Sequence, residues 1–408
     1  MARLERIAER LELKEFQLRA LLDVTKAINN NMEEVELVEL YRSIVQEQLG
    51  ITRLMLHVNS DGWRTVLTYG TSEQMAPSDI EQAAVWYKDI QVIGSGDPGS
   101  LGAFDVAVPV HHRDKPLAFL LIGDIDEEEQ RMSPTVKHLN FIQTLTNLIV
   151  VAMENRRMAR EDLMRERDKR ELELAAEMQA MLIPDRLPNE GTLRAAGWYQ
   201  PHRQVGGDYY DLFKTTQDKV VFCVADVSGK GIAASLLMSN FQATLRALAQ
   251  HGEEPLQAMI QGLNQRVYSN ARGERFITLF LGRFDPRTRE LEYVNSGHND
   301  PLLLLNGKIT GLHDGSIALG MMRDLPFLRP GKVEGIHDAT VLCYTDGLVE
   351  QENGSGEAFE PEHLSELLLQ HAKAGPSHLI ETIRTDFEEH RQGSPYLDDI
   401  AVLACSFG

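Results

Sequence analysis

The sequence predicts an α+β fold, built as two units that a long helix joins. Three observations lead to this fold class. The 408 residues exceed the roughly 150 residues that one ordinary domain needs. An almost continuously charged stretch, residues 154–171, separates two halves of different pattern. The C-terminal half alternates short apolar runs with two pairs of helical segments, which favours two sheets covered by helices.

The composition is ordinary for a folded protein in a reducing compartment. Hydrophobic residues make up 43% and charged residues 25%. No apolar run approaches the ~18 residues of a membrane span, and no secretory or organellar signal is evident at the N-terminus. Cys223, Cys343 and Cys405 lie in apolar runs without metal-type spacing, which predicts buried, reduced thiols. We therefore expect a cytoplasmic protein that makes no membrane contact.

The charge balance argues against a nucleic-acid partner. The formal net charge is -20, so the phosphate backbone of a nucleic acid would be repelled unless a concentrated basic patch intervened. The one dense basic stretch, residues 156–170, is interleaved with acidic residues. That alternation is typical of a solvated helix.

The first twenty residues predict a separate N-terminal helix, residues 1–20. Leu4, Ile7, Leu11, Leu18 and Leu21 occupy heptad a and d positions, and only Lys14 interrupts the series. This spacing is compatible with a short coiled coil that forms a homodimer. It is equally compatible with an amphipathic helix that packs on its own domain.

Residues 21–153 show a mixed pattern of helices and strands. Residues 37–50 predict a helix that ends at Gly50, residues 54–60 a strand, residues 105–124 a hairpin that turns near 113–115, and residues 135–155 a helix. This succession resembles a GAF domain, a small sensory module with a central antiparallel sheet. The resemblance implies a regulatory ligand or signal, whose identity the sequence does not give.

Two motif matches in this region are interpreted as loops. The glycine-rich segment 94–102 lacks the flanking strand and the following helix of a dinucleotide-binding loop. The tripeptide of residues 112–114 copies the catalytic loop of protein kinases, but no other kinase element accompanies it.

Residues 154–188 predict a helical linker. The linker is highly polar in its middle, and apolar residues return only at Leu174, Met178 and Met181, before Pro184 ends the helix. Such a connector can transmit a signal from the first unit to the second. An inert spacer would have the same composition, so both interpretations stay open.

Residues 189–408 predict the C-terminal domain, an α-β-β-α sandwich. The strands are expected at 220–227, 276–285, 291–297, 301–306, 339–347 and 399–406. The helices are expected at 231–248, 255–268, 361–371 and 376–391.

Four acidic motifs stand at the ends of these predicted strands or in the turns beside them: GGDYYD (206–211), ADVSGKG (225–231), YTDG (344–347) and LDDI (397–400). Carboxylates that converge at the rim of a core repel one another unless cations neutralise them. Carboxylate and carbonyl oxygens without histidine or thiol ligands favour Mg²⁺ or Mn²⁺. Two such ions can activate water for attack on phosphorus, so the motifs indicate phosphoester hydrolysis.

The residues of the motifs and their order along the chain also show a family resemblance. GGDYYD, ADVSGKG, NSGHNDPLLLL, YTDGLVE and DDIAVLA resemble, in this order, the SpoIIE-like branch of the PPM metal-dependent serine/threonine phosphatases. The resemblance implies two Mn²⁺ or Mg²⁺ ions and a phosphoserine or phosphothreonine protein as substrate, commonly an anti-sigma-factor antagonist of the STAS type.

The same resemblance implies a set of site residues. Asp226 would bridge both metals, and the main-chain carbonyl of Val227 would bind one of them. Asp346 and Asp398 would complete the shell of the other metal. Asp208 would hold the first metal more loosely, and Asp208 and Asp226 would be the catalytic residues.

Five neighbouring residues have competing interpretations. Asp211 either binds metal or caps a turn, and Asp399 either binds metal or only neighbours a ligand. His298 is a general acid or a structural histidine. Lys230 contacts phosphate or faces solvent, and Arg203 is a candidate for a bidentate phosphate contact.

Two other functions compete with the phosphatase. A GAF-like unit, a signalling helix and a GGD motif also occur in diguanylate cyclases, although Tyr-Tyr-Asp follows the GGD here and the later motifs have no place in a cyclase. The second competitor is a catalytically inactive phosphatase fold that serves as a signalling scaffold. The presence of all the expected acidic residues argues against the scaffold.

Overall fold

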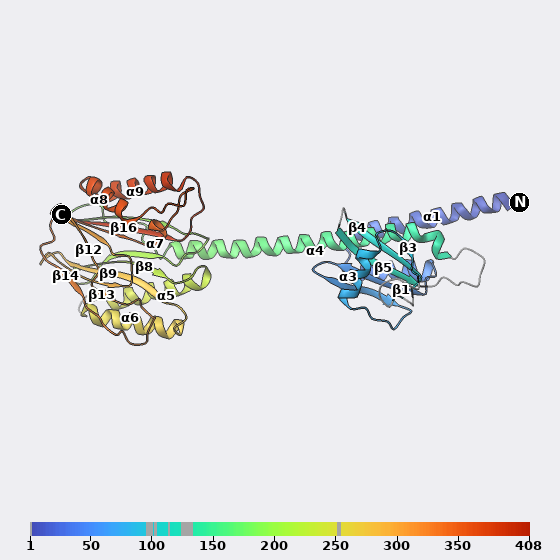
Figure 1. The fold of residues 1–408 in the computed structure, drawn as a ribbon, viewed down its shortest axis with the longest axis horizontal. Coiled ribbons are helices and arrows are strands. Elements are labelled where there is room, and N and C mark those ends of the chain that lie inside the picture. The colour runs from blue at the N-terminus through green and yellow to red at the C-terminus, as the bar shows by residue number, and fades with distance from the viewer. Residues whose placement is uncertain (1, 95–100, 102–103, 113–114, 124–133, 251–253) are drawn as a thin grey trace. The chain divides into compact units, whose positions relative to one another are not determined.

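The computed structural model describes residues 2–94, 101, 104–112, 115–123, 134–250 and 254–408. The chain divides into two compact units, 1–166 and 167–408, each with its own sheet or sheets (Figure 1). The glycine-rich segment 94–102 and the tripeptide 112–114 fall largely outside the described residues. Their interpretation as loops therefore stays a prediction.

The first unit is organised around a five-stranded antiparallel sheet. Its strands run in the order β2-β1-β5-β4-β3. Because side chains alternate between the two faces of a strand, Leu54 and Leu56 of β1 join one core cluster and Met55 joins another. The bounds are β1 Arg53–Asn59, β2 Trp63–Tyr69, β3 Gln91–Val92, β4 Val106–His112 and β5 Lys115–Gly123. The predicted hairpin at 105–124 corresponds to β4 and β5.

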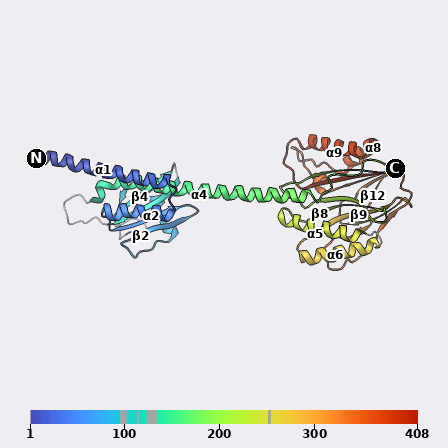
Figure 2. The same cartoon turned by 180° about the vertical axis from the view of Figure 1, so that it is seen from behind.

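Helices cover both faces of this sheet. The helices α1 (Ala2–Asn29), α2 (Glu34–Arg42) and the first part of α4 (Pro134–Ala180) pack over one face, and α3 (Pro77–Trp86) packs over the other. Figure 2 shows α1 and α2 from behind. A π-helical segment, Ser43–Gln48, extends α2, so the helix predicted at 37–50 is confirmed.

Most heptad residues of α1 do not pack on their own unit. Leu4, Ile7, Leu11 and Leu18 are between 56% and 74% exposed, and only Leu21 of the predicted series packs against the core. The fully packed part of the helix is formed by Gln17, Ala20, Val24 and Ala27. The expectation of a helix that buries its heptad stripe against its own domain is therefore wrong for four of the five residues.

The second unit contains two sheets that pack face to face. One has the order β13-β10-β9-β8-β7 with β14 beside β10, and the other has the order β12-β11-β15-β16-β6. All the strand pairs are antiparallel except β10 with β13. Side chains of β8 and β9 share one core with side chains of β15 and β16. All three cysteines are buried and unpaired, as predicted.

The strands of the second unit have these bounds: β6 Leu193–Gln200, β7 Tyr209–Lys214, β8 Val220–Val227, β9 Ile277–Asp285, β10 Glu290–Ser296, β11 Leu302–Leu305, β12 Lys308–Gly311, β13 Gly315–Ser316, β14 Gly331–Val333, β15 Ala339–Tyr344 and β16 Ile400–Phe407. The sequence did not predict the strands β6, β7, β12, β13 and β14. The strands β6 and β7 follow the linker helix in the sequence, and each lies at the edge of one sheet.

A pair of helices lies on the outer side of each sheet, which gives the predicted α-β-β-α layering (Figure 1). The helices α5 (Ile232–Ala249) and α6 (Leu256–Ala271) cover the first sheet, and α8 (Pro361–His371) and α9 (Pro376–Arg391) cover the second. Short helical segments, α7 (Asp346–Val349) and a 3₁₀ turn (Ala372–Ala374), complete the unit. Within the described part of the chain, no helix has the length and apolar character that a membrane crossing requires.

Candidate metal centre

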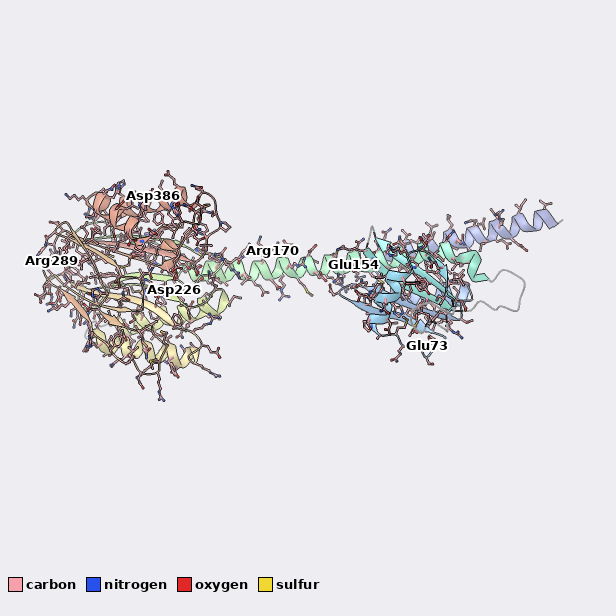
Figure 3. All side chains as sticks on the ribbon, viewed as in Figure 1. Glu73, Glu154, Arg170, Asp226, Arg289 and Asp386 are labelled. Atoms are coloured by element: carbon pink, nitrogen blue, oxygen red, sulfur yellow. The ribbon has the colours of Figure 1, made fainter. Side chains whose placement is uncertain are left out.

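The four acidic motifs meet at one end of the two facing sheets. Asp208 directly precedes β7, and Asp226 lies near the end of β8, its antiparallel neighbour. Asp346 follows β15, and Asp398 precedes β16, which pairs with β15. Neighbouring antiparallel strands place the start of one beside the end of the other. Figure 3 labels Asp226 between the outer helical layers of this unit.

Glycines allow the loops of this end to approach one another closely. A Cβ atom on Gly207 would lie 3.0 Å from the carbonyl oxygen of Val227, and one on Gly347 would lie 2.0 Å from the carbonyl oxygen of Asp399. The first contact joins the GGDYYD loop to the ADVSGKG loop, and the second joins YTDG to LDDI. Larger residues would separate these loops and the carboxylates they carry.

Asp399 connects loops that are far apart in the sequence. Its Oδ2 accepts a hydrogen bond from the backbone N–H of Gly207 at 2.6 Å, and its Oδ1 accepts one from His202 at 2.7 Å. A carboxylate with two backbone donors is a strong structural link. The structure thus favours the interpretation of Asp399 as a neighbour of the ligands.

The carboxyl groups of Asp208 and Asp226 lie in one electrostatic environment. Burial, followed by the negative charge of Asp226, raises the pKa of Asp208 well above its ordinary range. Burial and then the negative charge of Asp346 raise the pKa of Asp226 to about 7, and the charge of Asp398 acts in the same direction. Each effect requires that the carboxylates face one another across a poorly solvated space.

Asp346 belongs to the same environment. Burial raises its pKa, and the negative charges of Glu350 and Asp398 add to this effect. Even so, no three His, Cys, Asp or Glu side chains within the described ranges are spaced so that they could hold one metal ion as they stand.

Lys230 contacts one of these carboxylates. Its Nζ forms an ion pair with Asp398 Oδ2 at 2.7 Å and donates to the carbonyl oxygen of Leu397 at 2.7 Å. The ammonium group thus neutralises one of the acidic side chains. Lys230 is neither free in solvent nor, in this arrangement, directed at a phosphate.

The group of acidic residues fits hard divalent cations. Asp208 Oδ2 is buried and has no hydrogen-bond partner among the described residues, which is costly for a carboxylate unless a cation or a proton compensates. The surrounding donors are carboxylate and carbonyl oxygens, the ligands that Mg²⁺ and Mn²⁺ prefer.

Comparison with known proteins identifies this unit. Residues 216–408 match the family described as Stage II sporulation protein E (SpoIIE). The C-terminal unit contains a SpoIIE-family domain. This match confirms the resemblance inferred from the sequence for the four motifs inside it, while GGDYYD lies just before it.

Two relatives and one solved structure agree with this assignment. The chain is 28% identical over 218 residues to the phosphoserine phosphatase RsbU of Bacillus subtilis (strain 168), which covers 53% of this chain and 64% of RsbU. It is 25% identical over 383 residues to protein IcfG of Synechocystis sp. (strain ATCC 27184 / PCC 6803 / Kazusa), which covers 84% of this chain and 59% of IcfG. The chain thus spans less than two thirds of either relative. The SiaA-PP2C domain of Pseudomonas aeruginosa superposes with a TM-score of 0.53 at 21% identity, over 60% of this chain and 99% of that domain. The SpoIIE domain therefore has the PP2C fold.

Asp211, the last residue of the GGDYYD motif, is paired with an arginine and not with the carboxylates expected to bind metal. It is fully buried, and Arg246 of α5 forms two hydrogen bonds with it, both 2.8 Å long. The hydroxyl of Tyr209 donates to the same carboxylate. Asp211 thus ties β7 to α5, and neither the turn cap nor the metal ligand considered from the sequence describes it.

His298 and Arg203 occupy different environments. His298 is buried, its Nδ1 lies 2.8 Å from Thr278 Oγ1, and its backbone N–H donates to Asn295. Burial lowers the pKa of His298 to about 4, so the ring is neutral at physiological pH, which favours the structural interpretation over a general acid. Arg203 is exposed.

Gln179, near the end of α4, was missed by sequence reasoning. Its side-chain amide donates to the carbonyl of Gly206 at 2.6 Å and accepts from the N–H of Gly206 at 3.1 Å. Gln179 is only 7% exposed, whereas its helical neighbours Met178 and Ala180 are exposed. A polar residue at the last turn of a helix whose second half is mostly exposed gives no distinctive signal in the sequence.

Proposed function

We propose that this protein is a metal-dependent phosphatase that hydrolyses phosphoserine or phosphothreonine in a partner protein. The observation that carries the proposal is the mutual effect of the negative charges of Asp208, Asp226, Asp346 and Asp398 on one another at one end of a PP2C fold. The likeness to RsbU, a phosphoserine phosphatase, supports the same reaction.

Two Mn²⁺ or Mg²⁺ ions would be held by these four carboxylates and by the main-chain carbonyl of Val227. When bound, the ions would supply positive charge for the phosphate and make a water molecule more acidic. In the reaction, the oxygen of that water bonds to phosphorus, and the bond between phosphorus and the seryl oxygen breaks. The products are inorganic phosphate and the free hydroxyl group.

The protein's own residues position this site. Asp399 holds the GGDYYD loop against the LDDI loop, which fixes Asp208 relative to Asp398. Asp226 is anchored inside the sheet, because β8 pairs with β9 along its whole length. Lys230 must leave Asp398 before that carboxylate can bind a cation, so metal binding and the position of Lys230 are coupled.

Regulation by the first unit is part of the proposal. We assign that unit to the GAF type because it has a central antiparallel sheet with helices on both faces. The helix α4 continues from that unit to Gln179, whose two hydrogen bonds hold the loop that carries Asp208. A signal that moves the end of α4 would therefore move a metal ligand. The substrate that we propose is a phosphorylated STAS-type antagonist of an anti-sigma factor.

Hydrolysis of an aryl phosphate, measured with and without Mn²⁺, tests the activity. We expect Mn²⁺-dependent turnover by the natural chain and a loss of roughly 100-fold or more in Asp226→Asn, the magnitude typical of a lost electrostatic contribution to catalysis. Asp218→Asn is the matched control, since Asp218 is an exposed carboxylate in the turn between β7 and β8 with φ 59°, where asparagine is tolerated.

Two outcomes would contradict the proposal. Undiminished Mn²⁺-dependent turnover in Asp226→Asn would remove Asp226 from the site. No turnover by the natural chain of either an aryl phosphate or a phosphoserine peptide would favour the inactive scaffold. Formation of a cyclic nucleotide from GTP would favour the cyclase, which neither the fold nor the family match supports.

A further inference from the structure

The exposed side of α5, the helix that directly follows the ADVSGKG motif, carries apolar side chains. Ile232 is 55% and Leu236 65% exposed, and the two residues are one helical turn apart, so they lie on the same side. The opposite side of α5 packs into the core through residues such as Ala234, Met238 and Phe241. A single exposed leucine is ordinary, but this pair begins only six residues after Asp226.

A groove of about 480 Å³ adjoins this apolar side. Ala233, Leu236 and Asn240 of α5 line one wall, and Asn270 and Arg275 belong to the other wall, at and beyond the end of α6. We call this feature the α5 groove. A hydrogen bond of 2.6 Å from Asn270 to the side chain of Asn240 joins its two walls.

The α5 groove is attached directly to the metal-binding turn. Arg275 donates to the carbonyl of Ser228 at 2.7 Å, and the N–H of Phe276 donates to the hydroxyl of Ser228 at 2.9 Å. Gly229 has φ +87°, and a Cβ atom there would lie 2.2 Å from Arg275 Nη1. The turn therefore requires glycine in order to seat Arg275, which connects the groove to the segment between Asp226 and Lys230.

The charges around the site indicate which substrate the α5 groove accepts. The candidate metal centre is acidic and the whole chain has a net charge of -20, so acidic residues beside a phosphoserine would be repelled. The α5 groove carries one cation, Arg275, and one acid, Glu274, and its other lining residues are alanine, leucine and asparagine. Apolar side chains can be buried there without an electrostatic cost.

We infer that the α5 groove docks the segment of the substrate protein that flanks the phosphoserine, and that this segment carries apolar side chains. This inference rests on the proposed phosphatase function and adds substrate selectivity to it. Leu236 is the central contact because it is the most exposed apolar residue of the groove. Asn240 and Asn270 would meet the polar backbone of the docked segment.

Two phosphoserine peptides of ten residues test the inference. They differ only in that the positions flanking the phosphoserine are leucines in one peptide and serines in the other. We expect the natural chain with Mn²⁺ to show a KM roughly 10-fold lower for the leucine peptide, the effect of partly burying one or two leucine side chains. Leu236→Asp should abolish this preference, while turnover of p-nitrophenyl phosphate stays the same.

Leu369→Asp provides the matched control. Leu369 is 50% exposed on α8, which packs on the other sheet, so this variant adds the same charge away from the α5 groove and should keep the preference. Equal KM values for the two peptides in the natural chain, or an unchanged preference in Leu236→Asp, would overturn the inference.

A binding measurement separates this inference from the proposed function. The anisotropy of the fluorescent leucine peptide is followed in Asp226→Asn and in Asp226→Asn combined with Leu236→Asp. Weakening of roughly 10-fold in the double variant supports docking even if the natural chain turns over no substrate, in which case only the proposed function fails. Equal affinity in both variants contradicts docking, whatever the turnover.

Discussion

The protonation of Asp226 depends on the charges of its neighbours. Without metal, burial and the charges of Asp346 and Asp398 raise its pKa to about 7, against an ordinary value of 3.8. The folded protein therefore holds a proton that the unfolded chain releases. The stabilisation from this proton is complete below about pH 4 and is lost as the pH rises through about 7.

This loss of stability with rising pH gives a prediction for the metal-free protein. In chelator, Asp226→Asn should unfold less readily than the natural chain, and its advantage should grow between pH 5 and pH 8. The advantage should reach on the order of 3 kcal/mol, since asparagine carries no charge to repel its neighbours. Thermal unfolding of both proteins at several pH values measures it.

Added Mn²⁺ serves as the control for this prediction. Because the cations would replace the proton, Mn²⁺ at pH 8 should stabilise the natural chain more than Asp226→Asn. A difference between the two proteins that does not change with pH would show that Asp226 lies apart from the other carboxylates.

For single residues, the sequence indicated which aspartates belong to one site, but it did not indicate the role of each one. Motif order predicted that Asp208, Asp226, Asp346 and Asp398 belong together. It could not separate Asp399 from the ligands, because that role depends on backbone groups of His202 and Gly207, nearly 200 positions away. Such contacts are set by loop packing, for which a single sequence carries no periodic signal.

Among the secondary-structure elements, the best predicted were those whose sequence contains both a residue that favours the start of a helix and a regular spacing of apolar residues. The helices α8 and α9 begin at Pro361 and Pro376, where proline is favoured at the first helical position, and their predicted bounds agree with the structure. The strand β7 was missed because Asp211 interrupts its apolar run, and only the partner Arg246 makes that buried carboxylate tolerable.

The helix α4 gives the prediction that belongs to this scale. Gln179→Ala removes both hydrogen bonds to Gly206 and should loosen the loop that carries Asp208. Each bond contributes about 1 kcal/mol, so half-maximal activity should require roughly 10-fold more Mn²⁺. A titration of aryl phosphatase activity against Mn²⁺ measures the shift.

The control for Gln179 lies on the same turn of the helix. Glu177 is exposed, so Glu177→Ala should leave the Mn²⁺ requirement unchanged. If Gln179→Ala lowered thermal stability but kept the natural Mn²⁺ requirement, Gln179 would support folding without positioning the metal ligand.

For the whole molecule, the exposed apolar side chains of α1 and α4 bear on assembly. Leu4, Ile7, Leu11 and Leu18 form an exposed stripe on α1, and Leu163, Leu174 and Met178 are exposed on α4. Within α4 these three residues recur near one side of the helix, since they are separated by 11 and 4 positions. Exposed apolar stripes of this length are typical of helices that pair with another chain.

We therefore predict a homodimer. At micromolar concentration the natural chain should have twice its chain mass of 45.9 kDa, as measured by light scattering after size-exclusion chromatography. Leu11→Asp combined with Leu18→Asp should shift the mass toward that of one chain, because two buried charges in a short interface are strongly unfavourable. Val35→Asp, at a 74% exposed residue of α2 outside the stripe, should leave the dimer intact. A monomeric mass for the natural chain would refute the homodimer, and any effect of α4 on the catalytic site would then occur within a single chain.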